Sequence, residues 1–277
     1  MIFACTDKSY CLPAIPLQIQ HTHDDAATNI SPHPFTGVAS SISATFLEVM
    51  QLVKRQRDLA KSHAFASRRH IEDLETLMTE AAELEQRVTL QRIPDLDSIR
   101  DPQDPTTPIH HLTKMAACQR DTSLLQLRRV FPDLAAQRSS VNGDYAGPQD
   151  RSTMEAVVDK QCLSMALSIL DRLASIPESS GTTPFQTILL LSTSSELKLS
   201  RITNMTTSLN QAELEASLIM DAKVIEAREF VISRLTTSQS PIPGGRLTRL
   251  LETIQKIWYL LDEDHGARNI YWIDMVA

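Results

Sequence analysis

The apolar run that decides the fold is Pro184-Phe185-Gln186-Thr187-Ile188-Leu189-Leu190-Leu191. Proline suits the first turn of a helix, because its missing N–H would have no helical partner there. Residues 188–191 are apolar on all sides, which a surface helix would not tolerate, so they predict a buried central helix. A strand over residues 185–191 is the competing interpretation, because a short apolar run also suits a buried strand.

Amphipathic repeats on both sides of this run favour the helical interpretation. Apolar residues recur at three-to-four spacing, and prolines or glycines interrupt the pattern between segments. Six further helices are predicted, over residues 40–62, from residue 71 to before Pro94, and over 109–130, 152–176, 211–237 and 246–261. In the segment 211–237 the apolar positions are Leu214, Leu218, Ile219, Ala222, Ile225, Phe230, Ile232 and Leu235. The predicted fold is all-α, a single array of about seven amphipathic helices around the buried central one.

The amino-terminal stretch differs from the rest of the chain. Residues 1–36 contain four prolines and a polar run over 21–29, and they show no sustained apolar period. We expect a disordered, proline-containing leader over residues 1–36, followed by a helical domain over 37–277. Loops are predicted over residues 95–108 and 137–150, where prolines, aspartates and glycines gather.

Composition limits the possible functions. The 277 residues are 42% hydrophobic and 22% charged, which is typical of a folded globular protein. The net charge of −7 lacks the basic excess of a domain that docks on phosphate backbones, so no direct DNA binding is expected. Four scattered cysteines are too few for a disulfide scaffold, which favours a reducing, intracellular compartment. No membrane association is expected.

Metal-binding and catalytic residues are not predicted. The clustered candidates are His21, His23, Asp24, Asp25 and His33, together with Cys5 and Cys11. Their spacing does not match a structural zinc site, and histidines in a proline-rich tail are usually solvated. The sequence contains no nucleophile elbow, phosphate-binding loop, dinucleotide fingerprint or zinc-protease motif. We therefore expect no catalytic residue, no metal and no cofactor, and no residue is assigned to effector binding.

Other reactive or charged residues have simple structural interpretations. The pair His110-His111 is expected at a helix entry, and Glu83 with Glu85 on a solvated helix face. Small core positions are expected for Cys118 and Cys162. Two basic clusters are short and offset by neighbouring acids, which makes them weak phosphate or nuclear-import patches: Lys54-Arg55-Arg57 and Arg68-Arg69.

The carboxyl end of the sequence gathers large aromatic side chains. Both tryptophans of the chain lie here, in the segments 257–262 and 271–276. Trp258 shares a helix face with apolar neighbours and should point into the core, and Trp272 can fold back against it beyond Gly266. The alternative is that Trp272 lies on an exposed tail and binds a partner. Large aromatics at a terminus usually pin that terminus to the core.

An ordered set of motifs resembles the fungal-specific transcription factor domain, the helical region downstream of the binuclear zinc cluster in many fungal regulators. The segments 257–262 and 271–276 resemble the end of that domain. The other matching motifs, in order, are Ala81–Arg87, Leu124–Phe131, Leu173–Pro177 and Arg234-Leu235. The resemblance covers about residues 37–277. Two departures stand out: Thr193–Glu196 replaces the family's Gly-Cys-Glu, and the six-cysteine DNA-reading cluster is missing. Two explanations are open: a natural regulator without that module, or a gene model that misses its first exon.

This resemblance implies a nuclear regulator of transcription, with fungal metabolic or secondary-metabolite genes as the expected targets. Its implied partners are proteins of the transcription machinery or a DNA-binding regulator, together with a small-molecule effector. The rivals are a non-catalytic helical adaptor, and an enzyme or carrier with an apolar helical pocket, whose mark would be titratable residues converging in a cavity.

Overall fold

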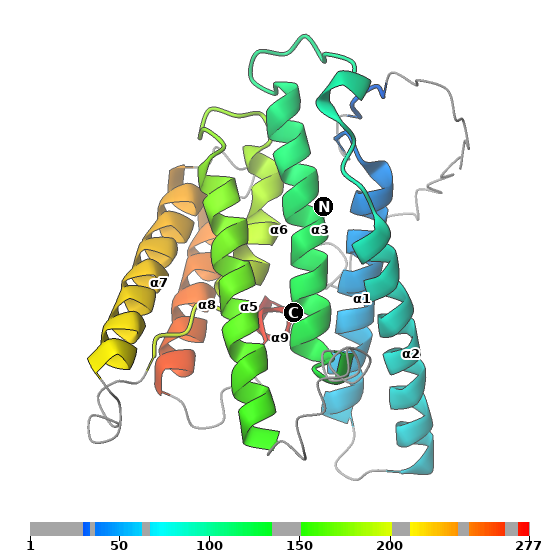
Figure 1. Ribbon diagram of the computed structural model, residues 1–277, viewed down its shortest axis with the longest axis vertical. Coiled ribbons are helices and arrows are strands. Elements are labelled where there is room, and N and C mark those ends of the chain that lie inside the picture. The colour runs from blue at the N-terminus through cyan, green and yellow to red at the C-terminus, as the bar shows by residue number, and fades with distance from the viewer. Residues whose placement is uncertain are drawn as a thin grey trace.

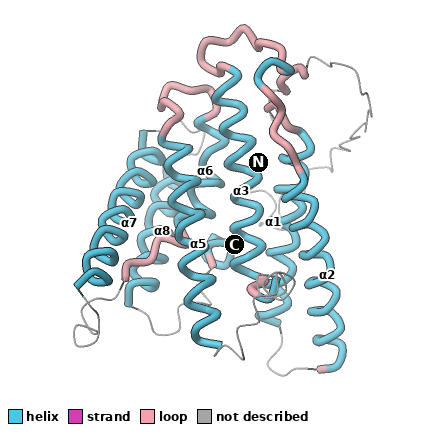
Figure 2. The backbone as a smooth tube through the Cα atoms, in the orientation of Figure 1, coloured by secondary structure: helices cyan, strands magenta, loops and turns pink. Residues whose placement is uncertain are grey.

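The computed structural model describes residues 30–33, 37–62, 67–134, 151–200, 211–237, 244–263 and 271–276. Over these ranges the chain is an array of helices joined by loops (Figures 1 and 2), and the described part contains isolated bridges but no strand. The all-α prediction is confirmed. No helix among the described residues is long and apolar enough to cross a membrane.

The helix boundaries follow the apolar pattern closely. The long helices are α1 (Ser40–Ser62), α2 (Arg68–Leu90), α3 (Ile109–Val130), α5 (Arg151–Ala174), α6 (Thr183–Ser194), α7 (Gln211–Thr237) and α8 (Gly244–Glu263), and the short ones are the 3-10 turn η2 (Leu96–Ser98) and α9 (Trp272–Val276). α2 begins three residues earlier than predicted, because the Ser67 side chain accepts a hydrogen bond from the His70 N–H at 3.2 Å and so caps the helix. The last helix, α9, was not predicted as a helix.

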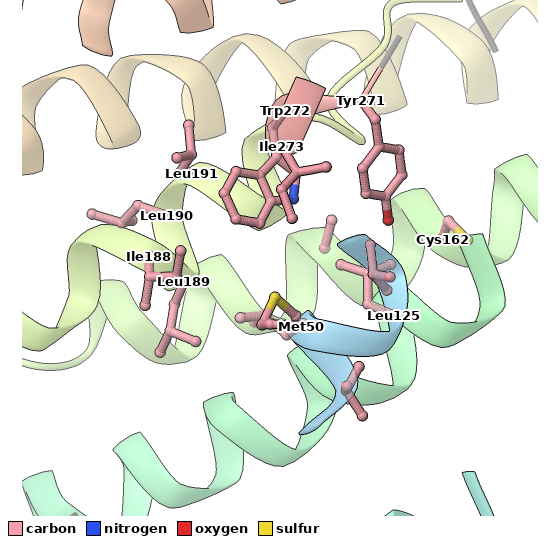
Figure 3. Close-up of a cluster of buried hydrophobic side chains, with 14 of the residues drawn as sticks. Met50, Leu125, Cys162, Ile188, Leu189, Leu190, Leu191, Tyr271, Trp272 and Ile273 are labelled. Atoms are coloured by element: carbon pink, nitrogen blue, oxygen red, sulfur yellow. The ribbon is translucent and has the colours of Figure 1, made fainter. Parts of the chain in front are cut away.

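The central helix is α6, as the apolar run predicted. It contacts α3, α5 and α7, and every residue from Gln186 to Ser194 is buried. The competing strand over 185–191 is therefore wrong. Figure 3 shows the leucines of α6 in a cluster with Met50 of α1 and Leu125 of α3. One hydrophobic core thus runs through the array, with α3 in contact with α1, α2, α5 and α6.

The edge helix α7 differs from the expected pattern. Four of the apolar positions named in the sequence are exposed: Leu218, Ile219, Ala222 and Ile225. Its buried apolar side chains are Val224, Ala227, Val231 and Leu235. In α7 the apolar residues occupy two faces, and α5, α6 and α8 cover only one of them because α7 lies at the outer edge of the array (Figure 1).

The charged residues singled out in the sequence have three different environments. Each basic cluster is offset by acids, as expected, with Lys54 paired to Asp58 at 3.3 Å and Arg68 to Glu72 at 2.9 Å. Glu83 is exposed, but the solvated position expected for Glu85 is wrong. Glu85 lies on the face of α2 that turns toward α3, where its carboxylate is 3.6 Å from the Arg128 Nε.

The segment before α1 joins the loop that precedes α3. The Ile30 N–H donates to the Ser98 carbonyl at 2.8 Å, and the Arg100 N–H donates to the Ile30 carbonyl at 2.9 Å. Ile30 also packs on a small apolar cluster that includes Ile42 and Ile99. The domain boundary between residues 36 and 37 stays a prediction.

Several expectations concern residues outside the described ranges. These are most of the leader, with Cys5, Cys11, His21, His23, Asp24 and Asp25, the loop over 137–150, and Gly266.

Candidate functional site

A buried glutamine on α3 holds the carboxyl-terminal segment in the core. The Gln126 Oε1 accepts hydrogen bonds from the Tyr271 hydroxyl at 2.8 Å and from the Trp272 Nε1–H at 3.2 Å. The Gln126 Nε2 donates to the Ser192 carbonyl of α6 at 3.2 Å. We call residues 271–276 the carboxyl-terminal clasp. Trp272 is 3% exposed, so the predicted fold-back is confirmed and the exposed-tail alternative is wrong.

Ion pairs also hold the carboxyl-terminal clasp against α1. The Asp274 carboxylate accepts from the Arg57 guanidinium at 2.7 and 3.0 Å and lies 2.8 Å from the Lys61 Nζ. The same guanidinium lies 5.6 Å from the centroid of the Tyr271 ring. Charged and stacking contacts therefore join the last described helix to the first, in addition to the hydrogen bonds at Gln126.

A charged cluster lies between α3, α5 and the end of α6, where Glu196 is buried and Arg129 and Asp159 are partly buried. The Arg129 guanidinium lies 2.7 Å from the Asp159 carboxylate and 3.5 Å from the Glu196 carboxylate. Burial raises the pKa of Glu196, and the neighbouring guanidinium opposes that rise. The Glu196 carboxylate in turn holds the pKa of Arg129 above its usual value.

Trp258 links α8 to α6 and α7. Its Nε1–H donates to the Ser194 carbonyl at 2.9 Å, at the end of the central helix. The Arg228 guanidinium lies 5.0 Å from the Trp258 ring centroid and donates to both Asp262 carboxylate oxygens at 2.8 Å. The Leu199 N–H donates to the same carboxylate at 3.2 Å. The prediction that Trp258 faces the core is confirmed.

A second polar network begins at the helix entry of α3. The His111 Nδ1 lies 3.0 Å from the Ser180 Oγ, which is 2.9 Å from the Thr182 Oγ1. The Gln186 Nε2 donates to that Thr182 oxygen at 3.4 Å, and the Arg234 Nη1 donates to the Gln186 Oε1 at 3.4 Å. All five residues are buried. The network therefore ties α3, the loop before α6, α6 itself and α7 together.

Arg234 ends this network at the carboxyl end of α5. Its Nη2 donates to the Ile176 carbonyl at 2.8 Å and to the Leu173 carbonyl at 3.5 Å. Carbonyl oxygens at a helix carboxyl end carry partial negative charge, which favours a cation there. Burial lowers the pKa of Arg234, and the Phe230 ring centroid lies 5.1 Å from its guanidinium. Arg234 thus acts as a cap for α5.

None of these groups is arranged for nucleophilic chemistry. Ser180 and His111 resemble a nucleophile and base, but the Ser180 oxygen is buried and shared with Thr182, whose N–H also donates to it at 3.3 Å. Burial raises the pKa of both Cys118 and Cys162 to about 12, which keeps these thiols protonated. Both cysteines lie in the core, as expected. Among the described residues, no three His, Cys, Asp or Glu side chains are placed to hold a metal ion.

We predict that the fold loses stability on acidification through His111. Burial, with help from nearby His110 and Lys114, lowers the pKa of His111 below its usual value of 6.5. Below that pH the unfolded chain binds a proton that the folded chain does not, so the free energy of unfolding falls as pH drops. Urea unfolding of the His111→Asn variant should show a shallower fall between about pH 7 and 5. The control His110→Asn, at an exposed ring, removes only a smaller contribution than burial and should retain most of the slope, and equal slopes in all three proteins would contradict the assignment.

Comparisons with known proteins give one finding. A family model described as the fungal specific transcription factor domain matches residues 5–277. No curated protein and no solved structure matches this chain.

Proposed function

Because this chain belongs to the fungal-specific transcription factor domain family, we propose that it is a regulatory domain of transcription that acts through protein partners or a small effector. The observation that carries the proposal is the match over residues 5–277, which includes every described element. We further propose that the protein works in the nucleus. Fungal metabolic or secondary-metabolite genes are the proposed targets.

The motifs that resemble the family meet one another inside the fold, although they are far apart in the sequence. The contacting pairs are Glu85 with Arg128, Gln126 with Tyr271 and Trp272, and Arg234 with Ile176. These residues hold helices together. We therefore assign the shared motifs to the scaffold and place regulatory contacts on the surface.

We propose that this chain does not read DNA by itself. Its net charge is −7, and its four cysteines include no pair at the two-residue spacing of a zinc cluster. The described basic side chains Lys54, Arg55, Arg57 and Arg68 each form an ion pair with an acid. Recruitment by a separate DNA-binding regulator fits these features.

We also propose that the domain has no catalytic role. The closest approach to a catalytic pair, Ser180 with His111, is bonded into the buried network that joins the helices. The Cys118 and Cys162 thiols are buried and protonated.

A tethering experiment tests the regulatory role. The complete chain is fused to an unrelated DNA-binding domain and expressed in a fungal host that carries a reporter gene with the matching operator. We expect reporter output to change several-fold relative to the DNA-binding domain alone, and a fluorescent fusion of the chain to accumulate in the nucleus. A reporter without the operator is the control.

Two outcomes would contradict the proposal. Unchanged reporter output from a well-expressed, folded fusion would favour the helical adaptor over the regulator. Nanomolar binding of DNA by the purified chain at physiological salt would overturn its dependence on another DNA reader.

A further inference from the structure

An apolar stripe runs along the outer face of α7. Leu218, Ala222 and Ile225 follow one another at spacings of four and three, so they share one face, and Ile219 borders Ala222. The three large side chains are 54% (Leu218), 61% (Ile219) and 48% (Ile225) exposed. Single exposed apolar residues are ordinary, but a contiguous row marks an interaction surface. We call these four residues the α7 stripe.

Among the described residues, the α7 stripe is not used for packing within the fold. α7 is held to α5, α6 and α8 by Val224, Ala227, Val231 and Leu235 on its opposite face. Its outer face lies at the edge of the array (Figure 1). Two apolar faces on one helix indicate two sets of contacts, of which the described part of the chain supplies one.

Carboxylates border the stripe. Glu215, Glu226 and Glu229 are exposed, and helical spacing places Glu226 beside Ala222 and Glu229 beside Ile225. Of the other charges on α7, Arg228 binds Asp262 and Arg234 is buried, which leaves Lys223 as the exposed cation among the described side chains of this helix. The surface is therefore apolar along its middle and acidic at its border.

An open hollow of about 340 Å³ continues the surface toward α8. It is lined by Arg228, Glu229, Ile232, Ser233 and Trp258. Ile232 follows Ile225 after two helical turns, and Glu229 lies between them, so the hollow adjoins one end of the stripe. A hollow beside an apolar row can receive one anchoring side chain of a bound helix.

We propose that the α7 stripe and this hollow form a docking surface for an amphipathic helix of a partner protein, with lysine or arginine flanking the apolar face of that helix. The partner's apolar face covers the stripe, and its basic residues face Glu215, Glu226 and Glu229. This inference specifies a partner for the regulatory role proposed above and rests on that role for its biological meaning. The docking surface itself is inferred from the exposed side chains of α7 and the hollow beside them.

Charge complementarity distinguishes this partner from two other occupants. A second copy would bring the same acidic border against itself, and like charges at an interface are repulsive. Residues 1–29 of this chain contain one lysine and three aspartates, so they do not provide the basic flanks. A basic helix from another protein satisfies both the apolar and the acidic parts of the surface.

Two synthetic probes test the proposal on the full-length chain. One is a labelled amphipathic peptide of about 20 residues, with leucines at helical spacing and lysines on both flanks, long enough to form a helix. Its twin carries glutamate in place of every lysine. Fluorescence anisotropy should show binding of the basic peptide, weakening as salt rises, and at least about tenfold weaker binding of the acidic twin.

Matched variants locate the binding surface. Leu218→Gln with Ile225→Gln should weaken the basic peptide about tenfold or more, and Glu226→Lys with Glu229→Lys should reverse the preference between the two peptides. The control pair Leu90→Gln with Val157→Gln changes exposed apolar residues on α2 and α5 and should leave binding unchanged. Circular dichroism checks that each variant keeps its helix content.

The outcomes test the docking surface independently of the proposed function. Equal binding of both peptides, or binding unaffected by the α7 changes, overturns the docking surface. A concentration-dependent dimer that the Leu218 and Ile225 changes abolish also overturns it, in favour of a second copy. Because these measurements need no reporter gene, a failed tethering experiment leaves their result intact.

Discussion

Replacing Trp258 with alanine lowers the free energy of unfolding by about 3–5 kcal/mol, the usual cost of removing a buried tryptophan. The side chain is 8% exposed and fills the space between α8 and the end of α6. Its removal also leaves the Ser194 carbonyl without this donor and takes away the ring beneath Arg228. A domain of ordinary stability, about 5–15 kcal/mol, loses a large share of it.

The adjacent residue is a matched control. Tyr259 lies on the same helix, one position along, and is 63% exposed. Tyr259→Ala should change stability by about 0.5 kcal/mol or less, since exposed side chains away from special contacts contribute little. Both variants are measured by urea unfolding followed by circular dichroism. A similar, small effect for Trp258→Ala would show that α8 does not depend on this ring.

The helices could be predicted because their signals are local. Apolar periodicity, together with prolines and glycines between segments, gave α1, α3 and α7 with the bounds that the structure shows. The four-residue run at Ile188 predicted burial of α6 without any knowledge of its neighbours, since no solvent-facing side is left on such a helix. Two aromatic segments likewise predicted that the carboxyl end returns to the core.

The sequence interpretation was wrong about which helix faces are buried, because the burial of a face depends on the neighbouring helices. Glu85 looked solvated, but it follows Ala81 and Leu84 on the face of α2 that meets α3, and Arg128 supplies its partner. On α7, the sequence pattern groups the row beginning at Leu218 with the core face, although the described helices pack against α7 on one side only. Periodicity shows that a face is apolar, whereas tertiary structure decides which face is covered.

The polar contacts in the interior could not be predicted from the sequence. Gln126 forms a hydrogen bond with Tyr271, which lies 145 positions later in the sequence. Arg129 of α3 likewise forms an ion pair with Glu196, which follows α6. One local signal existed at Gln126, which lies between two leucines on a predicted amphipathic helix. A polar residue at such a position needs partners, but spacing alone does not name them.

Replacing Arg129 with methionine should be as damaging as the loss of Trp258. The change keeps an apolar stem of similar length but removes the guanidinium that faces Glu196 and Asp159. Glu196 then remains as a buried carboxylate without its counter-charge, and breaking a buried pair in this way costs about 3–5 kcal/mol. The exposed pair on α2 is the control: Arg68→Met, opposite Glu72, should cost about 0.5 kcal/mol or less.

A second substitution distinguishes a stranded charge from lost packing. Adding Glu196→Gln to Arg129→Met removes the unpaired carboxylate, so the double variant should regain a large part of the lost stability. If the cost came from packing, the two substitutions would instead destabilise additively. The double-mutant cycle therefore measures the coupling between the two side chains directly.

The dependence on pH provides an independent check of the same idea. In Arg129→Met the opposing guanidinium is gone, so the pKa of Glu196 lies further above its usual value of 4.5 than in the parent protein. The folded variant then takes up a proton at a pH where the unfolded chain does not, and its free energy of unfolding rises as pH falls from about 7 toward 5. The destabilisation relative to the parent should shrink over that interval, and the double variant should show no such recovery. A constant difference across the interval would mean that Glu196 is not the charge whose burial makes Arg129 necessary.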